Sequence, residues 1–411
     1  MLVPIAINEA VDKLASVLAE TVKLESEEVD LLEAVGRILA ADVYSPQDRP
    51  RTNVSAVDGY AVRSIDTVGA SPYNPIELTI KYYLKPGQDA RGVTVERGTA
   101  ARVLTGAPIP EGTDAVVMDE DVEVRDGKVV IYKQVSEGSN IVYRGEDLKQ
   151  ADLIGSKGQV VNPAMVGALA AVGIKSVKVY RKVRVALIAI GDELVEPGSS
   201  ATLGKDFNST VYVVYSQMIK DWIFQPTYYG ILPDDPVLVE EAIVRVIEKG
   251  ADMVITTAGT GVGEGDVVEH VMKKNTVVFR GVRIRPGRPT SCSVVSGKPV
   301  VHLSGFPVAS WTGYELLIRP AVQRWLGIKG FERPAIRATL TRRLPNVAGY
   351  TSLVRVQLRE QHGEFYAEPY MLRGSGVISS LLRTNGYVLI PEDLEGYEIG
   401  SKVTVYIHTY W

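Results

Sequence analysis

Residues 256–271 combine glycines and acids at a spacing that could bind a charged ligand. They read TTAGTGVGEGDVVEHV, with Glu264 and Asp266 set among alternating glycines. The apolar stretch ADMVI precedes this run and VVEHVMKK follows it, so the run is predicted to turn a strand into a helix. Glycines let a ligand approach the backbone closely, and free amides at a helix start attract anions. A tight packing turn would explain the glycines alone, whereas the acids favour a cation bridged to a bound anion.

Acidic residues also follow two other predicted strands. Glu193 comes shortly after the apolar stretch 182–190, and Asp234 comes shortly after the stretch 227–232. Parallel strands end at one edge of their sheet, so these two acids and Asp266 are expected to lie close together. They would repel one another there unless a divalent cation or raised pKa values relieved them, and oxygen-only ligands favour Mg²⁺. A plain helix cap is the alternative role for the Asp234 turn.

Positive charge comes on the next segment, RGVRIRPGRP at residues 280–289. Arg283, Arg285 and Arg288 would supply forked donors suited to phosphate or another oxyanion, and a solvated strand edge is the alternative. The net charge of −4 argues against a general nucleic-acid binder, so local charge would have to meet a bound anion. No Ser-His-Asp set is legible, and the four histidines lack zinc-ligand spacing.

These residues fall within 182–326, where apolar strands alternate with helical stretches. That rhythm predicts a parallel sheet with helices on both faces, which binds ligands beyond the carboxyl ends of its strands. The rest of the chain is predicted to form helices at 7–22 and 29–43, strands over 45–140 with a hairpin turn at 125–128, and strands only after Pro334.

The composition is that of a soluble globular protein. The chain has 411 residues, enough for more than one domain, and is 45% hydrophobic and 23% charged. No apolar run reaches the length of a membrane span, and the first residues lack a signal-peptide pattern, so no membrane contact is expected. The single cysteine, Cys292, is predicted to be a small buried side chain, and its isolation fits a reducing cytoplasm.

A series of motifs then resembles a known family. SAVDGYAVR, RVLTGAPIPEGTDAVVM, RGEDL, VALIAIGDEL, ILPDDP, GVGEGD and RPGRP occur in this order, and GSGVISSLLRTNGYVLIPE follows near the end. The set resembles the molybdopterin molybdenumtransferase family (MoeA), which is related to the gephyrin E domain. The resemblance covers essentially the whole chain.

The resemblance implies an elongated homodimer and a multidomain fold of α/β plus β type. Its central part would be a three-layer α/β domain similar to molybdopterin adenylyltransferase, with β-rich N-terminal domains and an all-β C-terminal domain. The implied domains are an N-terminal helix at 1–26 packing with the α/β domain, a linker and dimer domain at 27–44 and 141–180, a β-rich domain at 45–140, the α/β molybdopterin-binding domain at 181–328 and a C-terminal β domain at 329–411.

The family inserts molybdate into adenylylated molybdopterin, with a divalent cation such as Mg²⁺, and releases AMP. Carried over by motif, the catalytic residues are Asp58, Thr105, Asp147, Glu193, Asp234 and Asp266, of which Glu193, Asp234 and Asp266 are the metal ligands. The substrate-binding residues are Gly259, Gly261, Gly263, Glu264, Arg285, Arg288, Ser304 and Pro307. The implied partners are a second copy of the chain, a molybdopterin adenylyltransferase and apo-molybdoenzymes.

The chain departs from the family pattern around the expected oxyanion site. Most relatives read Ser-Gly-Gly-Val-Ser where this chain has residues 258–262, AGTGV, and Leu-Pro-Gly-Asn-Pro where it has 303–307, LSGFP. Arginine replaces lysine at Arg285 and Arg288. The choice between molybdate and tungstate therefore stays open. Two other functions also stay open, a nucleotide enzyme similar to the adenylyltransferase and a non-enzymatic scaffold that binds pterin.

Overall fold

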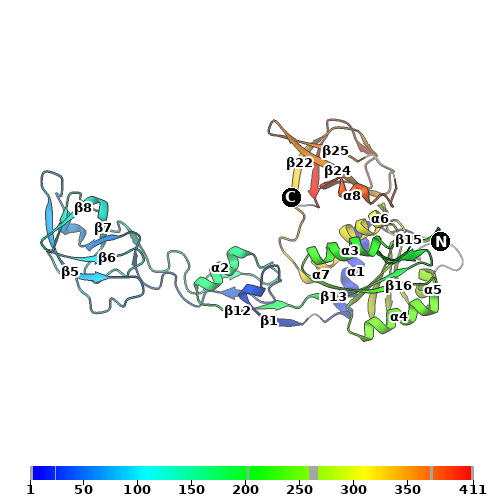
Figure 1. The fold of residues 1–411 in the computed structure, drawn as a ribbon, viewed down its shortest axis with the longest axis horizontal. Helices are drawn as coiled ribbons and strands as arrows, with labels where there is room; N and C mark the ends of the chain where they lie inside the picture. The colour runs from blue at the N-terminus through cyan, green and yellow to red at the C-terminus, as the bar shows by residue number, and fades with distance from the viewer. Residues whose placement is uncertain (1–2, 24, 201–202, 259–266, 371–373, 409–411) are drawn as a thin grey trace.

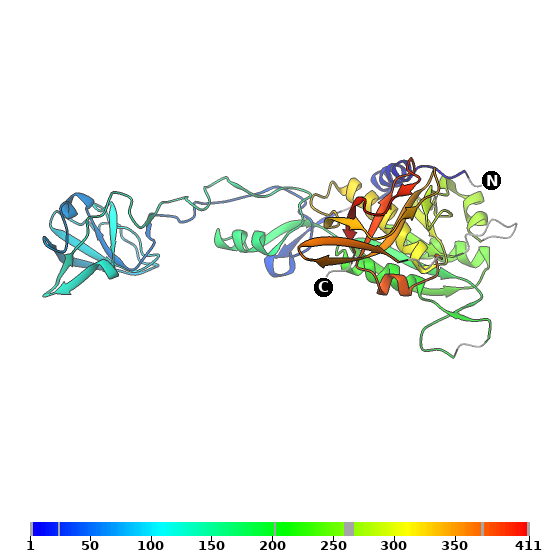
Figure 2. The same cartoon turned by 90° about the horizontal axis from the view of Figure 1, so that it is seen from above.

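The chain forms an elongated molecule of four units in the computed structural model, which describes residues 3–23, 25–200, 203–258, 267–370 and 374–408. The distal unit holds β4 to β9, the middle unit β1, η1, α2 and β12, the α/β unit α1 and β13 to α7, and the C-terminal unit β22 to β28. The distal unit lies at one end of the molecule, and the middle unit separates it from the other two (Figure 1). The view from above shows the same separation (Figure 2).

The α/β unit is built on a six-stranded sheet with the order β16-β13-β17-β21-β20-β18. Its strands are β13 (Val183–Ile190), β16 (Phe224–Leu232), β17 (Met253–Thr257), β18 (Thr276–Arg280), β20 (Ser291–Val295) and β21 (Lys298–Leu303). Side chains of β13 alternate between two cores, because successive residues of a strand point to opposite faces. The sheet is therefore buried on both sides.

Helices cover both faces of this sheet. One face packs against α1 (Ile7–Thr21), α3 (Thr210–Lys220), α6 (Pro307–Gly313), the π-helix η4 (Tyr314–Ile318) and α7 (Arg319–Leu326). The other face packs against α4 (Pro236–Glu248) and α5 (Val267–Lys274). The result is a three-layer arrangement of helix, sheet and helix.

The prediction of a parallel sheet is right for four strands and wrong at one edge. β16, β13, β17 and β21 run parallel, but β20 pairs antiparallel with both β21 and β18. Ser296 and Gly297, at φ 47° and 75°, form a two-residue turn between β20 and β21. So short a connection can join only antiparallel strands.

The helix predicted at 29–43 does not form in the middle unit. The chain there makes β1 (Ser26–Asp30), the short 3-10 helix η1 (Leu31–Glu33) and irregular backbone, and β1 pairs antiparallel with β12 (Ser176–Tyr180). Gly36 lies at φ 79°, a left-handed conformation that a continuous helix does not contain. The apolar residues that suggested a helix instead form a core with α2 (Pro163–Ala171) and β12.

Gly36 also makes a close contact that predicts a stability effect. A Cβ there would lie 2.1 Å from Cε3 of Trp222, so the indole ring lies directly over this glycine. We expect Gly36→Ala to destabilise the middle unit by at least about 2 kcal/mol, because the variant combines backbone strain with a clash. Native-state hydrogen exchange of the amides of α2 and β12 measures this.

Gly167 is the matched control in the same unit. It lies within α2 and has nothing within 4 Å of its Cβ position. Gly167→Ala should leave the unit as stable as before or stabilise it by up to about 1 kcal/mol, since alanine favours a helix. Equal exchange rates in the Gly36 and Gly167 variants would contradict the contact with Trp222.

The distal unit is a six-stranded sheet with the order β7-β4-β6-β5-β9-β8. Its elements are β4 (Gly59–Val62), η2 (Ser64–Thr67), β5 (Ile76–Leu84), β6 (Thr99–Val103), β7 (Ala115–Met118), η3 (Asp119–Asp121), β8 (Val122–Arg125) and β9 (Lys128–Ile131). The predicted hairpin turn is confirmed, because Arg125 pairs with Lys128 and both residues between them have positive φ. Two strand pairs lead from this unit to the middle unit, β3 (Val54–Ser55) with β10 (Ile141–Val142) and β2 (Val43–Tyr44) with β11 (Leu153–Gly155).

The C-terminal unit is mostly β, but the prediction of strands only is wrong. Its elements are β22 (Ala335–Leu340), β23 (Leu344–Pro345), β24 (Thr351–Gln361), β25 (Glu364–Pro369), α8 (Ser379–Leu382), β26 (Gly386–Ile390), β27 (Gly396–Tyr397) and β28 (Lys402–Ile407). The helix α8 breaks the pattern, and Ser380 within it is fully buried. β24 also pairs with β19 (Ile284–Arg285), so the arginine-rich segment of the α/β unit is bonded to the C-terminal unit.

Candidate active site

A cavity of about 1100 Å³ lies at the carboxyl ends of the parallel strands. Its lining comes from both the α/β unit and the C-terminal unit, which supplies Tyr350, Ser375 and Gly376. A position beyond the carboxyl ends of strands is where open α/β sheets bind their ligands. We refer to it below as the main cavity.

Two arginines of the 280–289 segment line the main cavity, and one does not. Arg285 and Arg288 are exposed side chains of its wall, and the Arg288 guanidinium lies 6.0 Å from the centre of the Tyr350 ring. Neither forms an ion pair with a carboxylate of the described residues. Arg283 instead donates to both carboxylate oxygens of Glu392, at 3.0 and 3.2 Å. Arg285 and Arg288 are thus the cations of this segment placed to meet an anion.

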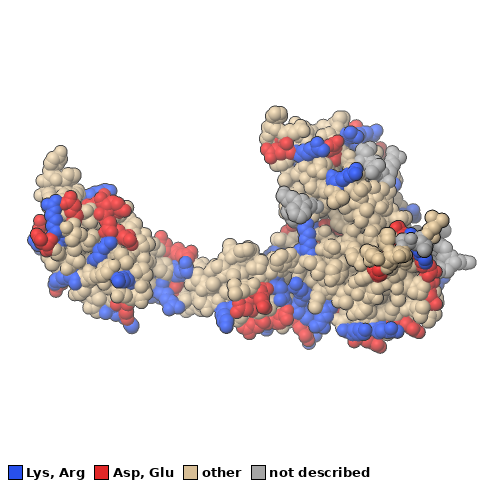
Figure 3. All heavy atoms as spheres, in the orientation of Figure 1, with Lys and Arg blue, Asp and Glu red and all other residues tan. Residues whose placement is uncertain are grey.

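Positive charge does not dominate the face of the molecule shown in Figure 3. On the face shown in Figure 3, basic and acidic side chains lie in small neighbouring groups over the units. An anion bound in the main cavity would therefore have to be met by the local placement of Arg285 and Arg288.

The acids predicted at the strand ends divide into three cases. Glu193 lines the main cavity, and its carboxylate lies over Gly191, where a Cβ would be 2.6 Å from Glu193 Oε2. Asp234 and Asp192 bond across the neighbouring strand ends, since each accepts from the other's backbone amide, at 3.1 and 3.4 Å. Asp235 is the helix cap, because its Oδ1 accepts from the amides of the first turn of α4. The cap alternative therefore holds for Asp235 and not for Asp234.

The glycine run itself lies outside the described residues, with Gly259, Gly261, Gly263, Glu264 and Asp266. Its entry is described at Ala258, which has φ 73° and donates its amide to Leu303 O at 3.1 Å. A Cβ on Gly305 would lie 2.9 Å from Ala258 Cβ, so these two turns pack tightly. Ser304 and Pro307, predicted to bind substrate, line the main cavity beside them.

Several residues of the main cavity were not predicted from the sequence. Asp206 and Phe207 form β15 (Asp206–Phe207), which pairs parallel with β14 (Leu194–Val195) and so returns the chain to the cavity. Asn208 follows and donates to Tyr228 Oη at 2.8 Å, and this hydroxyl donates to Glu196 Oε1 at 2.5 Å. Two-residue strands carry no detectable periodicity, so the sequence offered no signal for this segment.

Asp58 and Thr105 come together in the distal unit. The amide and the hydroxyl of Thr105 both donate to Asp58 Oδ1, at 2.6 and 2.8 Å. These bonds hold the pKa of Asp58 below its usual value, the backbone bond first and the hydroxyl second. The carboxylate is exposed and ionised at neutral pH. The pair belongs to the distal unit, which the middle unit separates from the α/β and C-terminal units that line the main cavity (Figure 1).

Asp147 lies in the connection between the distal and middle units. Its carboxylate accepts a hydrogen bond from Arg49 Nε at 2.7 Å, and Asp48, the residue before Arg49, accepts one from Arg144 Nε at 2.5 Å. Both pairs therefore join the two chain segments that form the connection. The structure thus brings Asp58 and Thr105 together, and places Asp147 and the main-cavity residues in two separate regions.

The carboxylate oxygens in the main cavity are of the type that a hard cation prefers as ligands. Glu193 and Asp206 line the main cavity with carboxylates, and among the described residues no histidine or cysteine lines it. Oxygen-only ligands suit Mg²⁺. Within the described residues no group of three potential ligands is assembled, so a complete site would need the segment that contains Asp266.

Comparison with known proteins decides the family. A chain of Methanocaldococcus jannaschii named for molybdopterin biosynthesis is 38% identical over 405 residues, which are 96% of this chain and 95% of the relative. The molybdopterin molybdenumtransferase of Bacillus subtilis is 33% identical over 412 residues, 98% of this chain and 94% of the relative. The chain belongs to the molybdopterin molybdenumtransferase (MoeA) family.

Family patterns and solved structures agree with this. Residues 5–173 match the MoeA N-terminal region (domain I and II), 186–324 the probable molybdopterin binding domain, and 337–407 the MoeA C-terminal region (domain IV). A crystal structure of the molybdopterin biosynthesis MoeA protein from Pyrococcus horikoshii superposes with a TM-score of 0.83, at 32% identity over 99% of this chain and 100% of that one.

The predicted family and the predicted multidomain fold are therefore confirmed. Membership of the MoeA family identifies the chain as an enzyme, a transferase of molybdenum cofactor biosynthesis. In the part of the chain that the structure describes, no helix has both the length and the apolar character needed to cross a membrane.

Proposed function

We propose that this MoeA family member inserts molybdate, or tungstate, into adenylylated molybdopterin and releases AMP. The observation that carries the proposal is the main cavity, where Arg285 and Arg288 stand without a carboxylate partner among the described residues, beside Glu193. The two arginines could bind the oxyanion of such a substrate, and the carboxylate could hold a metal ion bound to its phosphate. The name of the relatives, molybdopterin molybdenumtransferase, supports molybdopterin and molybdenum as the substrates.

Each group of residues has a task in this proposal. Arg285 and Arg288 hold the oxyanion by charge-assisted hydrogen bonds, and Ser304 with Pro307 shapes the adjoining wall. Glu193, with Asp234 and Asp266, would hold Mg²⁺, which neutralises charge on the leaving phosphate when it is bound. The amides of Gly259, Gly261 and Gly263 would receive phosphate or pterin.

We further propose that the enzyme is a homodimer with shared clefts. Asp58 and Thr105 form an ionised pair on the distal unit, far from the main cavity of the same chain (Figure 1). A second copy related by twofold symmetry could bring its distal unit to that cavity, and the first copy would do the same in return. Asp147, paired with Arg49 at the connection, would help to aim the distal unit.

Release of AMP tests the function directly. The protein is incubated with adenylylated molybdopterin, Mg²⁺ and molybdate, and free AMP is measured over time. We expect AMP to appear only when both molybdate and Mg²⁺ are present. A scaffold would bind the substrate without releasing AMP, and an adenylyltransferase would instead consume ATP and molybdopterin. Either outcome would contradict the proposal.

The remaining predictions keep the status of proposals. They are the cytoplasmic location, the contacts with an adenylyltransferase and apo-molybdoenzymes, and the domain boundaries. The distal, middle and C-terminal units each have a hydrophobic core of their own, which supports these boundaries. The core of the α/β unit also includes Ile38 of the middle unit and Leu353 and Tyr387 of the C-terminal unit, so the units pack together there.

A further inference from the structure

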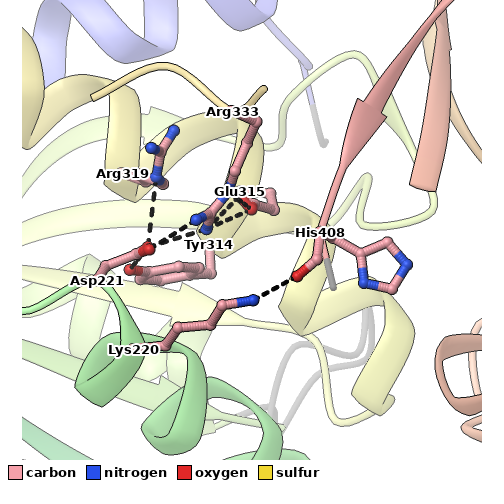
Figure 4. A network of polar contacts seen from close by, with 7 residues as sticks. All are labelled: Lys220, Asp221, Tyr314, Glu315, Arg319, Arg333 and His408. Carbon is pink, nitrogen blue, oxygen red and sulfur yellow. Dashed lines mark hydrogen bonds and ion pairs between the residues drawn. The ribbon is translucent and has the colours of Figure 1, made fainter. Parts of the chain in front are cut away.

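A buried cluster of charges lies where three units meet, outside the main cavity. Its members are Asp221 just after α3, Glu315 in η4, Arg319 at the start of α7, and Arg333 in the link to the C-terminal unit (Figure 4). Their exposed fractions are only 5%, 3%, 6% and 8%. Two acids and two arginines balance in formal charge, so we call this set the junction cluster.

Arg333 is the centre of the junction cluster. Its Nη1 and Nη2 donate to the two oxygens of Asp221, at 2.7 and 3.0 Å. Its Nε and Nη2 also donate to Glu315, at 2.6 and 3.1 Å. Arg319 pairs with Asp221 at 3.3 Å and stacks on Phe331 of the link, with 4.0 Å from guanidinium to ring centre. One guanidinium fork thus ties the link to two helices of the α/β unit.

Contacts around the cluster reach the other two units. Trp222, the residue after Asp221, lies over Gly36 of the middle unit. The amide of Lys329 in the link donates to Gly158 O of the middle unit at 3.0 Å. Lys220 Nζ donates to the backbone oxygen of His408, at the end of the C-terminal unit, at 2.6 Å (Figure 4).

This junction bears on the main cavity because the C-terminal unit supplies part of its wall. Tyr350, Ser375 and Gly376 belong to that unit, whereas Arg285 and Arg288 belong to the α/β unit. A change in the angle between the units would therefore move one wall against the other. Buried ion pairs are inefficient as a source of stability, since desolvation offsets most of their attraction, but their geometry can select one arrangement.

We infer that Arg333 is a positioning residue, which fixes the C-terminal unit against the α/β unit and thereby sets the shape of the main cavity. Its forked, planar donors bind Asp221 and Glu315 at fixed angles, so they fix the direction in which the link leaves the α/β unit. The consequence for substrate binding rests on the proposed function, whereas the consequence for the angle between units does not.

The test removes the charges together, so that no buried charge is left unpaired. The fourfold variant carries Asp221→Asn, Glu315→Gln, Arg319→Met and Arg333→Met. Arg337→Met is the matched control, because Arg337 is an exposed arginine of the same unit that donates to Lys402 O and Thr404 Oγ1. Folding of each full-length protein is checked by circular dichroism.

Spin labels report the angle between the units without any catalysis. They are placed on Glu248→Cys in α4 and Gln361→Cys in β24, two exposed positions. The one native cysteine, Cys292, is fully buried and so should not take up label. Labelled chains are mixed with an excess of unlabelled chains, so that the distance within one chain is measured in the proposed homodimer. We expect a single narrow distance distribution in the otherwise wild-type protein and in Arg337→Met, and a broad or shifted one in the fourfold variant.

Kinetics give the second measurement. In the AMP assay the fourfold variant should show a KM raised about tenfold and a kcat little changed. The displaced wall contributes to substrate binding but not to the reacting groups, so its displacement weakens binding and leaves the chemical step unchanged. A folded fourfold variant with the wild-type distance distribution would overturn the inference. If the fourfold variant does not fold, Asp221→Asn alone decides by the same distance measurement. Absence of AMP release from the wild type would contradict the proposed function, and the distances would still decide the role of Arg333.

Discussion

Arg288→Ala is expected to raise the molybdate concentration needed for AMP release by about 30-fold or more. The estimate takes the lower end of the roughly 2–5 kcal/mol lost when one partner of a buried charge contact is truncated, because the Arg288 side chain is exposed until a ligand fills the main cavity. Arg288 lines the main cavity, lies against Tyr350 and has no carboxylate partner among the described residues, so its charge is available to a ligand. A titration of initial rate against molybdate measures the shift.

Two further variants make this titration specific. Arg324 is an exposed arginine of the same unit that pairs with Asp12, so Arg324→Ala should leave the molybdate dependence within a few-fold of the wild type. Arg288→Lys keeps the positive charge but loses the forked donors, so its molybdate requirement should lie between those of Arg288→Ala and Arg324→Ala. An unchanged molybdate requirement in a folded Arg288→Ala protein would place the oxyanion elsewhere.

The acid-bearing edge of the sheet could be predicted because local signals and topology agree there. The strand β13 is almost entirely apolar, β17 is fully buried, and β16 ends in the apolar pair Ile231 and Leu232. Each of the three is followed by a turn rich in glycine, proline or acid. Parallel strands then leave little freedom in where those turns lie. The positions of Glu193 and Asp234 follow from this pattern alone.

Other features depend on contacts that no local pattern contains. The segment 29–43 has helical periodicity, but pairing of β1 with β12 and the left-handed Gly36 exclude a helix. Arg283 has the same sequence surroundings as Arg285, and only the fold shows that Glu392, more than a hundred residues later, pairs with it. The junction cluster likewise pairs Asp221 with Arg333, which lies far along the chain in the link. The periodicity of a sequence indicates the faces of one helix or strand and cannot predict such a distant pair.

Asp58→Asn is expected to lower AMP release by about 100-fold, the scale of losing one well-placed electrostatic group. Asparagine keeps the acceptor that receives both Thr105 bonds at Oδ1, so the distal unit should keep its fold. The loss would therefore report the missing charge. Binding of adenylylated molybdopterin should change much less, because the main cavity of each chain is intact. A wild-type rate of AMP release in Asp58→Asn would remove this carboxylate from the reaction.

The shared cleft is the central claim, and mixing two impaired proteins tests it most directly. Chains carrying Asp58→Asn are exchanged with chains carrying Arg288→Ala, at a low molybdate concentration where each parent alone releases AMP far more slowly than the wild type. A mixed dimer would then hold one cleft with both wild-type groups, so an equal mixture should regain about a quarter of the wild-type rate. Co-purification of differently tagged chains verifies that subunits have exchanged. Recovery of AMP release near that level is the result we predict, and its absence in a mixture with proven exchange would show that Asp58 does not act in the cleft of the partner chain.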